Sequence, residues 1–293
     1  MPHRAGHAAI VGRPNVGKST LLNALVGTKV AIVTPKPQTT RNRIVGIRTL
    51  PEAQVAFLDT PGIHTARSTL NRRMVDVARR TLGEVDAVLL VVDASVGLRH
   101  EDRALAESLP PRATTIVVLN KIDRVGKPSL LPLMATVGEL LPGREVVPVS
   151  ARNGSGVPVL LDVVARAMPE GPRLHGEDEF STEPARFLAQ EAVREYVFRA
   201  LAEEIPYKTA VVVEDYQEKP DQNLVVIHAT ILVARENHKG IVLGAGGTQL
   251  REIGRRARID LEALLGARVF LELFVRTEPG WAEDPHRLAE LGL

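Results

Sequence analysis

One eight-residue stretch constrains this chain more than any other. Residues 12–19 read G-R-P-N-V-G-K-S and fit the G-x-x-x-x-G-K-S pattern of a phosphate-binding loop. The apolar residues 8–11 predict a buried strand before it, and the leucines within 20–26 recur at helical spacing after it. A glycine-rich turn between a strand and a helix lets backbone N–H groups point at phosphate oxygens. The alternative is a chance glycine-rich turn.

The same loop assigns roles to two side chains. Lys18 is expected to reach the β and γ phosphates of a nucleotide, and the Ser19 hydroxyl is expected to bind Mg²⁺. The nucleotide-binding residues predicted in this stretch are Gly12, Arg13, Pro14, Asn15, Val16, Gly17, Lys18, Ser19 and Thr20.

From residue 7 to about 168, apolar strand-like runs alternate with helical stretches. This alternation predicts an α/β fold with a doubly wound, mostly parallel sheet. The expected strands are 8–11, 43–49, 54–58, 85–92, 115–119 and 146–149. Because ligands bind at the carboxyl ends of such strands, the motifs that follow them are expected to meet in one site.

Two motifs predict a metal site. The polar stretch 33–41 has no regular pattern, and we expect Thr40, rather than Thr39, to complete the Mg²⁺ shell and to sense the γ-phosphate. Residues 59–62 give the D-x-x-G pattern, which places a carboxylate near the metal and a glycine N–H near the γ-phosphate. The alternatives are a surface loop and a common turn. The predicted metal ligands are Ser19, Thr40 and Asp59, and the predicted nucleotide contacts here are Asp59, Thr60, Pro61, Gly62 and Ile63.

The stretch 120–123, N-K-I-D, discriminates between nucleotides. A carboxylate at Asp123 can accept hydrogen bonds from the N1–H and the exocyclic amine of guanine, whereas adenine offers no such pair of donors. Asn120 is expected to tie this loop to the phosphate-binding loop, and the Lys121 stem is expected to cover the ring. The predicted base contacts are Asn120, Lys121, Asp123, Ser150 and Ala151.

Together these motifs resemble the set found in the translation-factor-related GTPases, and the variants at 12–19, 38–41 and 59–62 are similar to the TrmE and Era branch. The resemblance implies slow GTP hydrolysis with Mg²⁺ and catalytic roles for Lys18, Thr40, Gly62 and Asn15. In that branch the residue that matches Asn15 is associated with a monovalent cation, which implies stimulation by K⁺. Ras-like proteins carry a water-orienting glutamine after the glycine of this motif, whereas Ile63 cannot hydrogen-bond a water.

The pattern changes after residue 170. Residues 171–184 are polar and acidic without apolar periodicity, which predicts a linker between a nucleotide-binding domain at 1–170 and a second domain at 185–293. The elements expected in the second domain are a helix at 185–204, strands at 209–216 and 224–234, a helix from 238, a helix over 250–264 and a strand at 268–276.

This order of elements, with G-A-G-G at 244–247 between two helices, is similar to the type II KH domain, a smaller α+β fold. A turn of small residues lets a nucleic-acid backbone approach the main chain, and the adjacent helices grip about four nucleotides. KH loops often carry a basic residue between the outer glycines, which this chain lacks. The predicted RNA contacts are Lys239, Gly244, Ala245, Gly246, Gly247, Arg251 and Arg255. The alternative for the arginines of 251–258 is a solvated helix face balanced by Glu252.

A GTPase of this branch with a C-terminal KH domain resembles the ribosome-assembly GTPases. That resemblance implies binding near the 3′ end of small-subunit ribosomal RNA, a role in 30S assembly and peripheral association with the inner membrane, and we expect a monomer. Three alternatives stay open. The chain could be an RNA-binding scaffold with incidental hydrolysis, an ATPase or kinase in which N-K-I-D is fortuitous, or a membrane-signalling GTPase whose second domain binds protein or lipid.

Composition narrows the chemistry and the location. The 293 residues include no cysteine, which excludes disulfides, thiol chemistry and cysteine zinc sites. No apolar run approaches the ~20 residues needed to cross a bilayer, and the start M-P-H-R carries no signal segment, so we expect a cytoplasmic protein. The net charge is only +2, so affinity for RNA requires a local basic patch. Aromatic residues are 3% of the chain, which predicts little base stacking.

Overall fold

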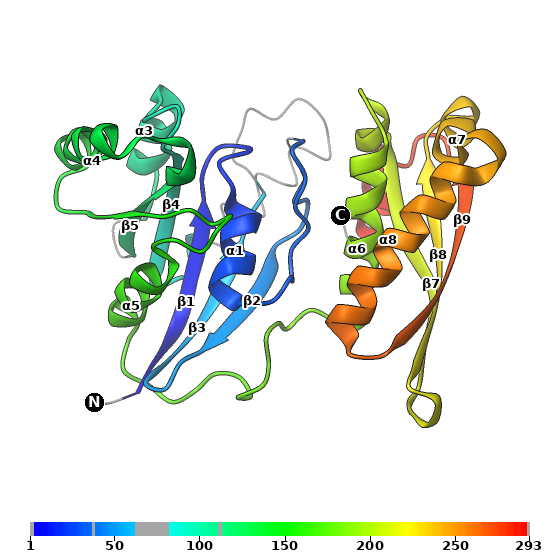
Figure 1. The fold of residues 1–293 in the computed structure, drawn as a ribbon, viewed down its shortest axis with the longest axis horizontal. Helices are drawn as coiled ribbons and strands as arrows, with labels where there is room; N and C mark the ends of the chain where they lie inside the picture. Colours follow the sequence, from blue (N-terminus) through cyan, green and yellow to red (C-terminus); the bar gives the residue numbers. More distant parts are fainter. Residues whose placement is uncertain (1–2, 37–38, 62–81, 111–112, 292–293) are drawn as a thin grey trace. The chain divides into compact units, whose positions relative to one another are not determined.

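The computed structural model of the chain describes residues 3–36, 39–61, 82–110 and 113–291 (Figure 1). The described residues form two compact units. The first contains those up to Ala31 and those from Thr40 to Thr182, and the second contains those of Ile32–Thr39 and those from Glu183 onward. Each unit is considered by itself.

A six-stranded sheet in the order β2-β3-β1-β4-β5-β6 forms the centre of the first unit. Its strands are β1 (Arg4–Val11), β2 (Ile44–Thr49), β3 (Ala53–Asp59), β4 (Ala87–Asp93), β5 (Thr114–Asn120) and β6 (Glu145–Pro148). Strand β2 is antiparallel to β3, and the pairs from β3 through to β6 are parallel. The predicted mostly parallel α/β sheet is therefore confirmed.

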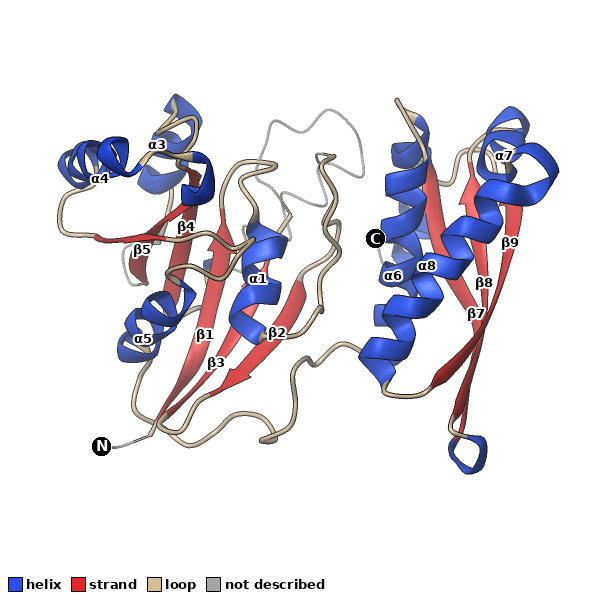
Figure 2. Ribbon diagram, viewed as in Figure 1, coloured by secondary structure: helices blue, strands red, loops and turns tan. Residues whose placement is uncertain are grey.

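Helices cover both faces of this sheet (Figure 2). Helices α1 (Lys18–Val26) and α5 (Val157–Ala167) contact β1 and β3. Side chains of α3 (His100–Glu107) and α4 (Lys127–Leu140) share a second apolar cluster with alternate residues of β1, β4 and β5. Strand β4 is buried along its whole length, as expected of a continuous apolar run in a sheet covered on both sides.

The first strand begins at Arg4, four residues before the apolar run that predicted it. Residues Arg4 to Ile10 keep an unbroken parallel register with β3, so backbone pairing extends the strand beyond its apolar part. A Cβ at Gly6 would lie 2.5 Å from an Asp86 carboxylate oxygen and 2.9 Å from the Met168 sulfur, so any larger residue here would force these side chains to shift.

The polar segment that follows the first sheet lies along the edge strand β2. The Ile47 amide donates to the Phe180 carbonyl at 2.8 Å, and the Gln54 side-chain oxygen accepts from the amides of Leu174 and His175. An edge strand leaves alternate backbone groups without sheet partners, and this segment supplies them. By these contacts residues up to Thr182 are part of the first unit, although their composition predicted a linker.

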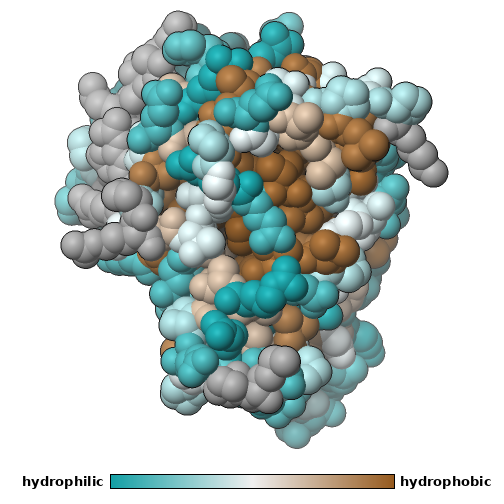
Figure 3. All heavy atoms as spheres, turned by 90° about the vertical axis from the view of Figure 1, so that its left-hand side faces the viewer, coloured by the Kyte–Doolittle hydropathy of each residue, from teal (hydrophilic) through white to brown (hydrophobic). Residues whose placement is uncertain are grey.

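The surface of α4 is unusually apolar for an outer helix (Figure 3). Leu131 of α4 is 73% exposed, and Val159 of α5 is 58% exposed. A surface helix ordinarily places polar residues on its outer face. Among the described residues, no helix is both long and apolar enough to traverse a lipid bilayer.

The second unit has the predicted order of elements around a three-stranded sheet, β7-β8-β9. Its elements are α6 (Ala185–Ala200), β7 (Thr209–Lys219), β8 (Leu224–Val233), α7 (Glu236–Leu243), the 3₁₀ turn η4 (Ala245–Gly247), α8 (Thr248–Leu265), β9 (Arg268–Thr277) and α9 (Pro285–Glu290). Strand β8 pairs antiparallel with β7 and parallel with β9. Helix α6 ends at Ala200, before the predicted residue 204, because the chain turns to an extended conformation at Leu201, with φ −90° and ψ 153°, and the Leu201 side chain is buried in the core.

Each face of the smaller sheet carries its own core. On one face, Val193 and Val197 of α6 and Ile253 and Leu261 of α8 pack with the inner side chains of all three strands. On the other face, Trp281 is 1% exposed and packs with Leu288 of α9 against side chains of β7 and β8.

Helix α6 also carries a buried ion pair within the second unit. The Arg194 guanidinium donates two hydrogen bonds to the Glu191 carboxylate, at 2.7 and 2.5 Å. A third nitrogen of Arg194 donates to the Thr39 carbonyl at 2.7 Å. Pairing and hydrogen bonds together compensate for the desolvation of both charges.

The small core around Trp281 predicts that a substitution within it lowers stability more than one on the exposed face of α8. Leu288→Ala should lower the free energy of unfolding of the second unit by about 2–5 kcal/mol, because it leaves a cavity beside the tryptophan. Urea unfolding followed by the fluorescence of Trp281, the only tryptophan of the chain, measures the change. Ile259→Ala on α8, where the side chain is 49% exposed, is the matched control, and equal losses in the two variants would contradict this description of the core.

Candidate functional site

The loop after β1 curls because glycine occupies its tightest positions. Gly12 and Gly17 have φ angles of 155° and 99°. A Cβ at Gly12 would lie 2.5 Å from the Val91 carbonyl oxygen, and one at Gly17 would lie 2.4 Å from the Asn120 amide nitrogen. Backbone of this shape has room for no other residue, and it directs its N–H groups inward.

Lys18 lies at the first position of α1 and is 7% exposed. Its ammonium donates to the carbonyls of Gly12 and Arg13, each at 3.1 Å. Burial lowers the pKa of Lys18 to about 8, and the Asp59 charge only partly opposes that effect. A buried cation held by neutral carbonyls, at the N-terminus of a helix, favours a polyanion such as a nucleotide phosphate.

Three side-chain oxygens come together beside this cation. The Ser19 hydroxyl donates to an Asp59 carboxylate oxygen at 2.6 Å and lies 2.9 Å from the Thr40 hydroxyl, which is 3.3 Å from the same carboxylate oxygen. The other Asp59 oxygen is buried and has no partner within the described residues. Burial raises the pKa of Asp59, against the opposing effect of Lys18 and of its hydrogen bonds.

This oxygen set fits a magnesium ion. Mg²⁺ prefers hard oxygen ligands and is usually bound through one or two carboxylates together with substrate phosphates. The structure brings together the predicted ligands Ser19, Thr40 and Asp59, while the Thr39 hydroxyl instead donates to the Lys36 carbonyl. In the part of the chain that is described, no group of three or more His, Cys, Asp or Glu residues forms a metal site of the all-protein kind.

Asn120 connects the phosphate-binding loop to the loops after β5 and β6. Its side-chain nitrogen donates to the Val16 carbonyl at 2.9 Å. Its side-chain oxygen accepts from the amides of Lys121 and Ala151, at 2.8 and 3.0 Å. Asn120 is 2% exposed, and it uses both the nitrogen and the oxygen of its side-chain amide to hold these three segments together.

The Lys121 side chain makes a second link between the same loops. Its ammonium donates to the Asn15 carbonyl at 2.5 Å and to Asp93 at 2.6 Å. Burial raises the pKa of Asp93, but hydrogen bonds from Lys121 and Ser95 outweigh it and hold that pKa below its usual value. The Lys121 stem therefore spans the space between the two loops.

Asp123 lies on the open side of this arrangement. The Ser150 hydroxyl, which is fully buried, donates to one of its carboxylate oxygens at 2.7 Å. The Asp123 carboxylate is exposed, so it retains acceptor capacity for a ligand. The phosphate and base ends of the predicted nucleotide site thus belong to one connected set of loops.

The remaining predicted nucleotide contacts, and two acidic residues that the sequence did not predict, complete the description of this site. The buried Thr60 hydroxyl donates to the Ile10 carbonyl at 3.0 Å and so fastens the end of β3 to β1. Gly62 and Ile63 lie outside the described residues. Sequence reasoning missed Asp93 and Asp102, and the latter is fully buried and pairs with Arg13 at 2.8 Å. Asp93 is the last residue of β4, and Asp102 lies in the first turn of α3. Neither belongs to a sequence motif, and their partners Lys121 and Arg13 are distant in sequence, so no local signal marked them.

The second candidate site begins at the glycine loop between α7 and α8. Gly244, Gly246 and Gly247 have φ angles of 69°, 58° and 75°. A Cβ at Gly244 would lie 2.7 Å from the Gln249 side chain, whereas Gly246 and Gly247 face open space. The loop therefore presents bare backbone to a ligand, as a nucleic-acid strand requires.

A groove of about 350 Å³ extends from this loop between α8 and β9. It contains the predicted contacts Gly247, Arg251 and Arg255. The groove residues that the sequence did not predict are Leu250, Gly254, Arg258, Leu271, Glu272 and Leu273. Lys239 does not line it and lies on α7, 3.9 Å from Glu236.

The arginines of α8 already have partners on the protein. The Glu252 carboxylate accepts from Arg255 at 2.8 and 2.9 Å and from Arg256 at 2.5 Å. These hydrogen bonds lower the pKa of Glu252 to about 2, so this carboxylate stays ionised at neutral pH. Arg251 donates to the Gly246 carbonyl at 2.7 Å. The helix face is thus both charge-balanced and positioned beside the loop.

Comparisons with known proteins agree with this division. The family described as "50S ribosome-binding GTPase" matches residues 7–121, and the family described as "KH domain" matches residues 204–282. The chain is 48% identical over 290 residues to the GTPase Era of Syntrophus aciditrophicus, covering 99% of this chain and 95% of that protein. It is 47% identical to the GTPase Era of Geobacter metallireducens, covering 99% and 98%.

Solved structures match the whole fold. A crystal structure of a single-residue variant of Aquifex aeolicus Era bound to GDP·AlF₄⁻ superimposes with a TM-score of 0.94 at 41% identity and 99% coverage of both chains. A structure of Era with MgGDPNP and nucleotides 1506–1542 of 16S ribosomal RNA gives the same score, identity and coverage. These matches confirm the predicted fold class of a P-loop GTPase domain followed by a KH domain.

The role of Asn120 predicts a measurable effect without any nucleotide. Asn120→Ala should lower the free energy of unfolding of the first unit by about 1–3 kcal/mol, because it leaves buried polar groups without partners. Urea unfolding by circular dichroism measures the loss, with Trp281 fluorescence reporting the second unit separately. Arg152→Ala, at an exposed residue of the neighbouring loop, should stay within about 0.5 kcal/mol, and a loss as large as that of Asn120→Ala would contradict the assignment.

Proposed function

Because the chain belongs to the Era family of GTPases, we propose that it is a GTP-operated switch that binds small-subunit ribosomal RNA through its KH domain during 30S assembly. The observation that carries the proposal is the Asn120 side chain, which joins the phosphate-binding loop to the loop of Asp123. The connected loops place Lys18 where a phosphate chain would bind and Asp123 where the edge of a guanine base would bind. An ATPase or kinase would have no use for the carboxylate.

The nucleotide is held by residues whose geometry is already set. Lys18 and the inward N–H groups of its loop bind the phosphates, while Ser19, Thr40 and Asp59 hold Mg²⁺, which neutralises phosphate charge when bound. Asp123 accepts hydrogen bonds from the guanine edge, and the Lys121 stem covers the ring. Sequence places Ile63 where a water-orienting side chain would be, so hydrolysis proceeds without a protein base and is slow.

A monovalent cation would add positive charge near the phosphates, since Arg13, the arginine of the phosphate-binding loop, is paired with the buried Asp102. Asn15 has a φ of 64°, and its carbonyl accepts from Lys121 at 2.5 Å. The Asn15 side chain makes no hydrogen bond to any described residue and is exposed on the phosphate-binding loop. An amide oxygen in that position is suited to K⁺, as the family resemblance implies.

Thr40 connects nucleotide state to RNA binding. Its hydroxyl lies at the metal site, and the carbonyl of the preceding residue, Thr39, accepts from Arg194 of α6. A change in the position of Thr40 with the γ-phosphate therefore acts on a segment that clusters with the KH unit. A relative solved with 16S ribosomal RNA supports an RNA ligand for this chain. We expect that RNA in the groove between α8 and β9, because the groove begins at the open backbone of the glycine loop and is lined by Arg251 and Arg255.

Three finer predictions remain part of the proposal. Peripheral association with the inner membrane rests on the family resemblance, a cytoplasmic location rests on the apolar pattern of the sequence, and a monomeric state is an expectation.

The switch is tested by RNA affinity in each nucleotide state. RNA corresponding to nucleotides 1506–1542 of 16S ribosomal RNA should bind about 5- to 150-fold more tightly with a GTP analogue than with GDP, the range typical of coupled sites. Fluorescence anisotropy measures the affinities, and linkage requires that the RNA tighten the analogue by the same factor. Equal affinity in the GTP-analogue, GDP and empty states would favour the scaffold alternative.

The groove is tested by filling it. Gly254 is helical, and a Cβ there would lie 3.4 Å from Leu273, so Gly254→Leu should fill the groove while improving helix propensity. We expect the same RNA to bind about tenfold or more weakly, since losing one hydrogen-bonded arginine–base contact costs about 1–3 kcal/mol. Gly138→Leu on α4, where a Cβ meets nothing within 4 Å, is the matched control. Unchanged RNA affinity in Gly254→Leu would remove the groove from the proposal.

The cation is tested by turnover in different salts. GTP hydrolysis should be at least about tenfold faster in K⁺ than in Na⁺, a part of what an arginine finger supplies. Asn15→Gly accepts the φ of 64° without strain and should abolish this preference while retaining GDP binding. Asn223→Gly, at φ 46° in the second unit, controls for replacing a left-handed asparagine. Equal rates in the two salts for the unmodified protein would rule out the K⁺ site.

A further inference from the structure

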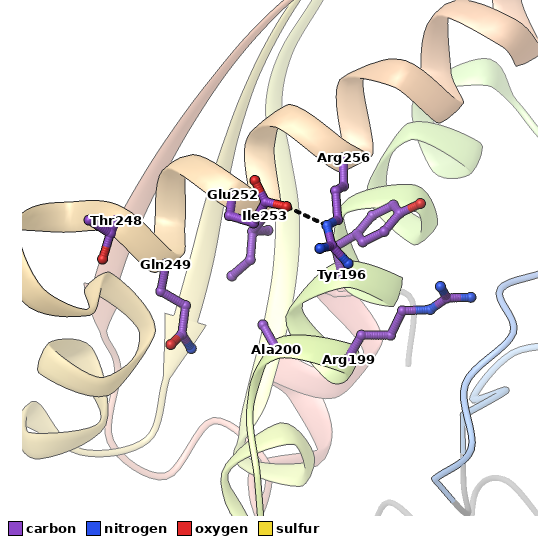
Figure 4. A pocket seen from close by; sticks show the side chains of 8 residues that line it. All are labelled: Tyr196, Arg199, Ala200, Thr248, Gln249, Glu252, Ile253 and Arg256. Carbon is purple, nitrogen blue, oxygen red and sulfur yellow. Dashed lines mark hydrogen bonds and ion pairs between the residues drawn. The ribbon is translucent and has the colours of Figure 1, made fainter.

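A second pocket lies on the opposite side of α8 from the groove. It measures about 380 Å³ and is enclosed by α6 and the first half of α8 (Figure 4). Tyr196, Arg199 and Ala200 reach it from α6, and the remaining lining residues come from α8. The first of these is Thr248, directly after the glycine loop. An RNA strand bound at the glycine loop would therefore lie next to both the pocket and the groove.

The lining has the chemistry that an unpaired nucleotide requires. Ile253, which is 2% exposed, provides an apolar wall, and Tyr196 provides an aromatic one. The Gln249 amide makes no hydrogen bond to any described residue, so it can donate to and accept from a base edge. Arg199 pairs with the buried Glu195 at 2.6 Å and Arg256 pairs with the more exposed Glu252 at 2.5 Å, so Arg256 is the arginine that an RNA phosphate could take over from its carboxylate.

Tyr196 is held in place rather than free to rotate. Its hydroxyl donates to an Asp260 carboxylate oxygen at 2.7 Å, and the Arg199 guanidinium lies 5.6 Å from the ring centroid. Burial and the neighbouring Asp260 raise the pKa of Tyr196, so the ring stays neutral. A fixed neutral ring beside two guanidinium groups is a surface on which a base can stack.

Glu252 connects the pocket to the groove. It lines the pocket and accepts hydrogen bonds from Arg256, also in the pocket, and from Arg255, in the groove (Figure 4). An RNA phosphate on either side of α8 would compete with this carboxylate for an arginine. The two hollows therefore share one charge network across the helix.

We propose that the pocket between α6 and α8 binds one unpaired nucleotide of the RNA strand whose backbone lies on the Gly244–Gly247 loop, with its base on Tyr196 and its phosphate at Arg256. The inference rests on the proposed RNA-binding function and extends the site beyond the approximately four nucleotides that a KH groove holds. It also assigns a stacking role to one of only three tyrosines in the chain.

The test uses the full chain with RNA of nucleotides 1506–1542. Tyr196→Leu retains apolar bulk but removes the ring, and it should weaken binding about 5- to 100-fold, the equivalent of one base stack. Gln249→Ala alters a side chain without an internal partner among the described residues and should weaken binding without affecting folding. Phe274→Leu, a half-exposed aromatic on β9, is the matched control and should bind as the unmodified protein.

Crosslinking supplies a readout that a purely structural role of Tyr196 would not give. RNA carrying 4-thiouridine should crosslink, on irradiation, to the tryptic peptide of residues 195–199, and the crosslink should disappear in Tyr196→Leu. The proposal is overturned if both pocket variants retain full affinity and that peptide carries no RNA, which would leave the pocket to a protein partner. If the unmodified protein does not bind this RNA at all, the proposed RNA function fails, whereas RNA binding that persists in both pocket variants removes only the pocket, so the two failures are distinguishable.

Discussion

The hydrogen bonds of the Asn120 side chain are the constraint on which the nucleotide site depends. Parallel strands β1 and β5 are separated by β4 in the sheet, so the loops at their carboxyl ends have no backbone pairing to fix their spacing. One buried amide fixes it by bonding to the phosphate-binding loop and to the loops after β5 and β6. The closeness of Gly17 to the same amide shows why that position excludes a side chain. Nucleotide selectivity thus follows from local packing as much as from the residues that face the ligand.

The second unit uses its helix α8 in a comparable way. The glycine loop before α8 leaves its backbone open to a ligand. One side of α8 lines the groove against β9, and the other side lines the pocket against α6. Glu252 holds arginines that face both of them, which keeps these basic side chains in place before any ligand arrives. The four arginines within residues 251–258 outnumber Glu252, so a chain with a net charge of only +2 still has a local basic surface.

Sequence predicted most of the fold, because its motifs combine local backbone demands with periodic apolar residues. The loop from Gly12 to Ser19, the alternating strands and the order of elements around Gly244 were all recognisable in this way. It did not predict Asp93 or Asp102, since a single acid has no pattern and its partner depends on the sheet order. The groove wall formed by Leu271 and neighbouring residues was missed for the same reason, since it depends on how β9 lies against α8. Lys239, a predicted RNA contact, lies on α7 beside Glu236 and outside the groove lining.

The most direct test of the account is a thermodynamic cycle on the guanine contact. Calorimetry would measure the binding of GDP and of inosine diphosphate, which lacks the exocyclic amine, to the unmodified protein and to Asp123→Ala. If the carboxylate accepts from that amine, the two deletions should be non-additive by about 1.5–3 kcal/mol, the value of a hydrogen bond to a charged group. Strictly additive losses would show that Asp123 and the base do not meet, and the account of one connected guanosine triphosphate site would be wrong.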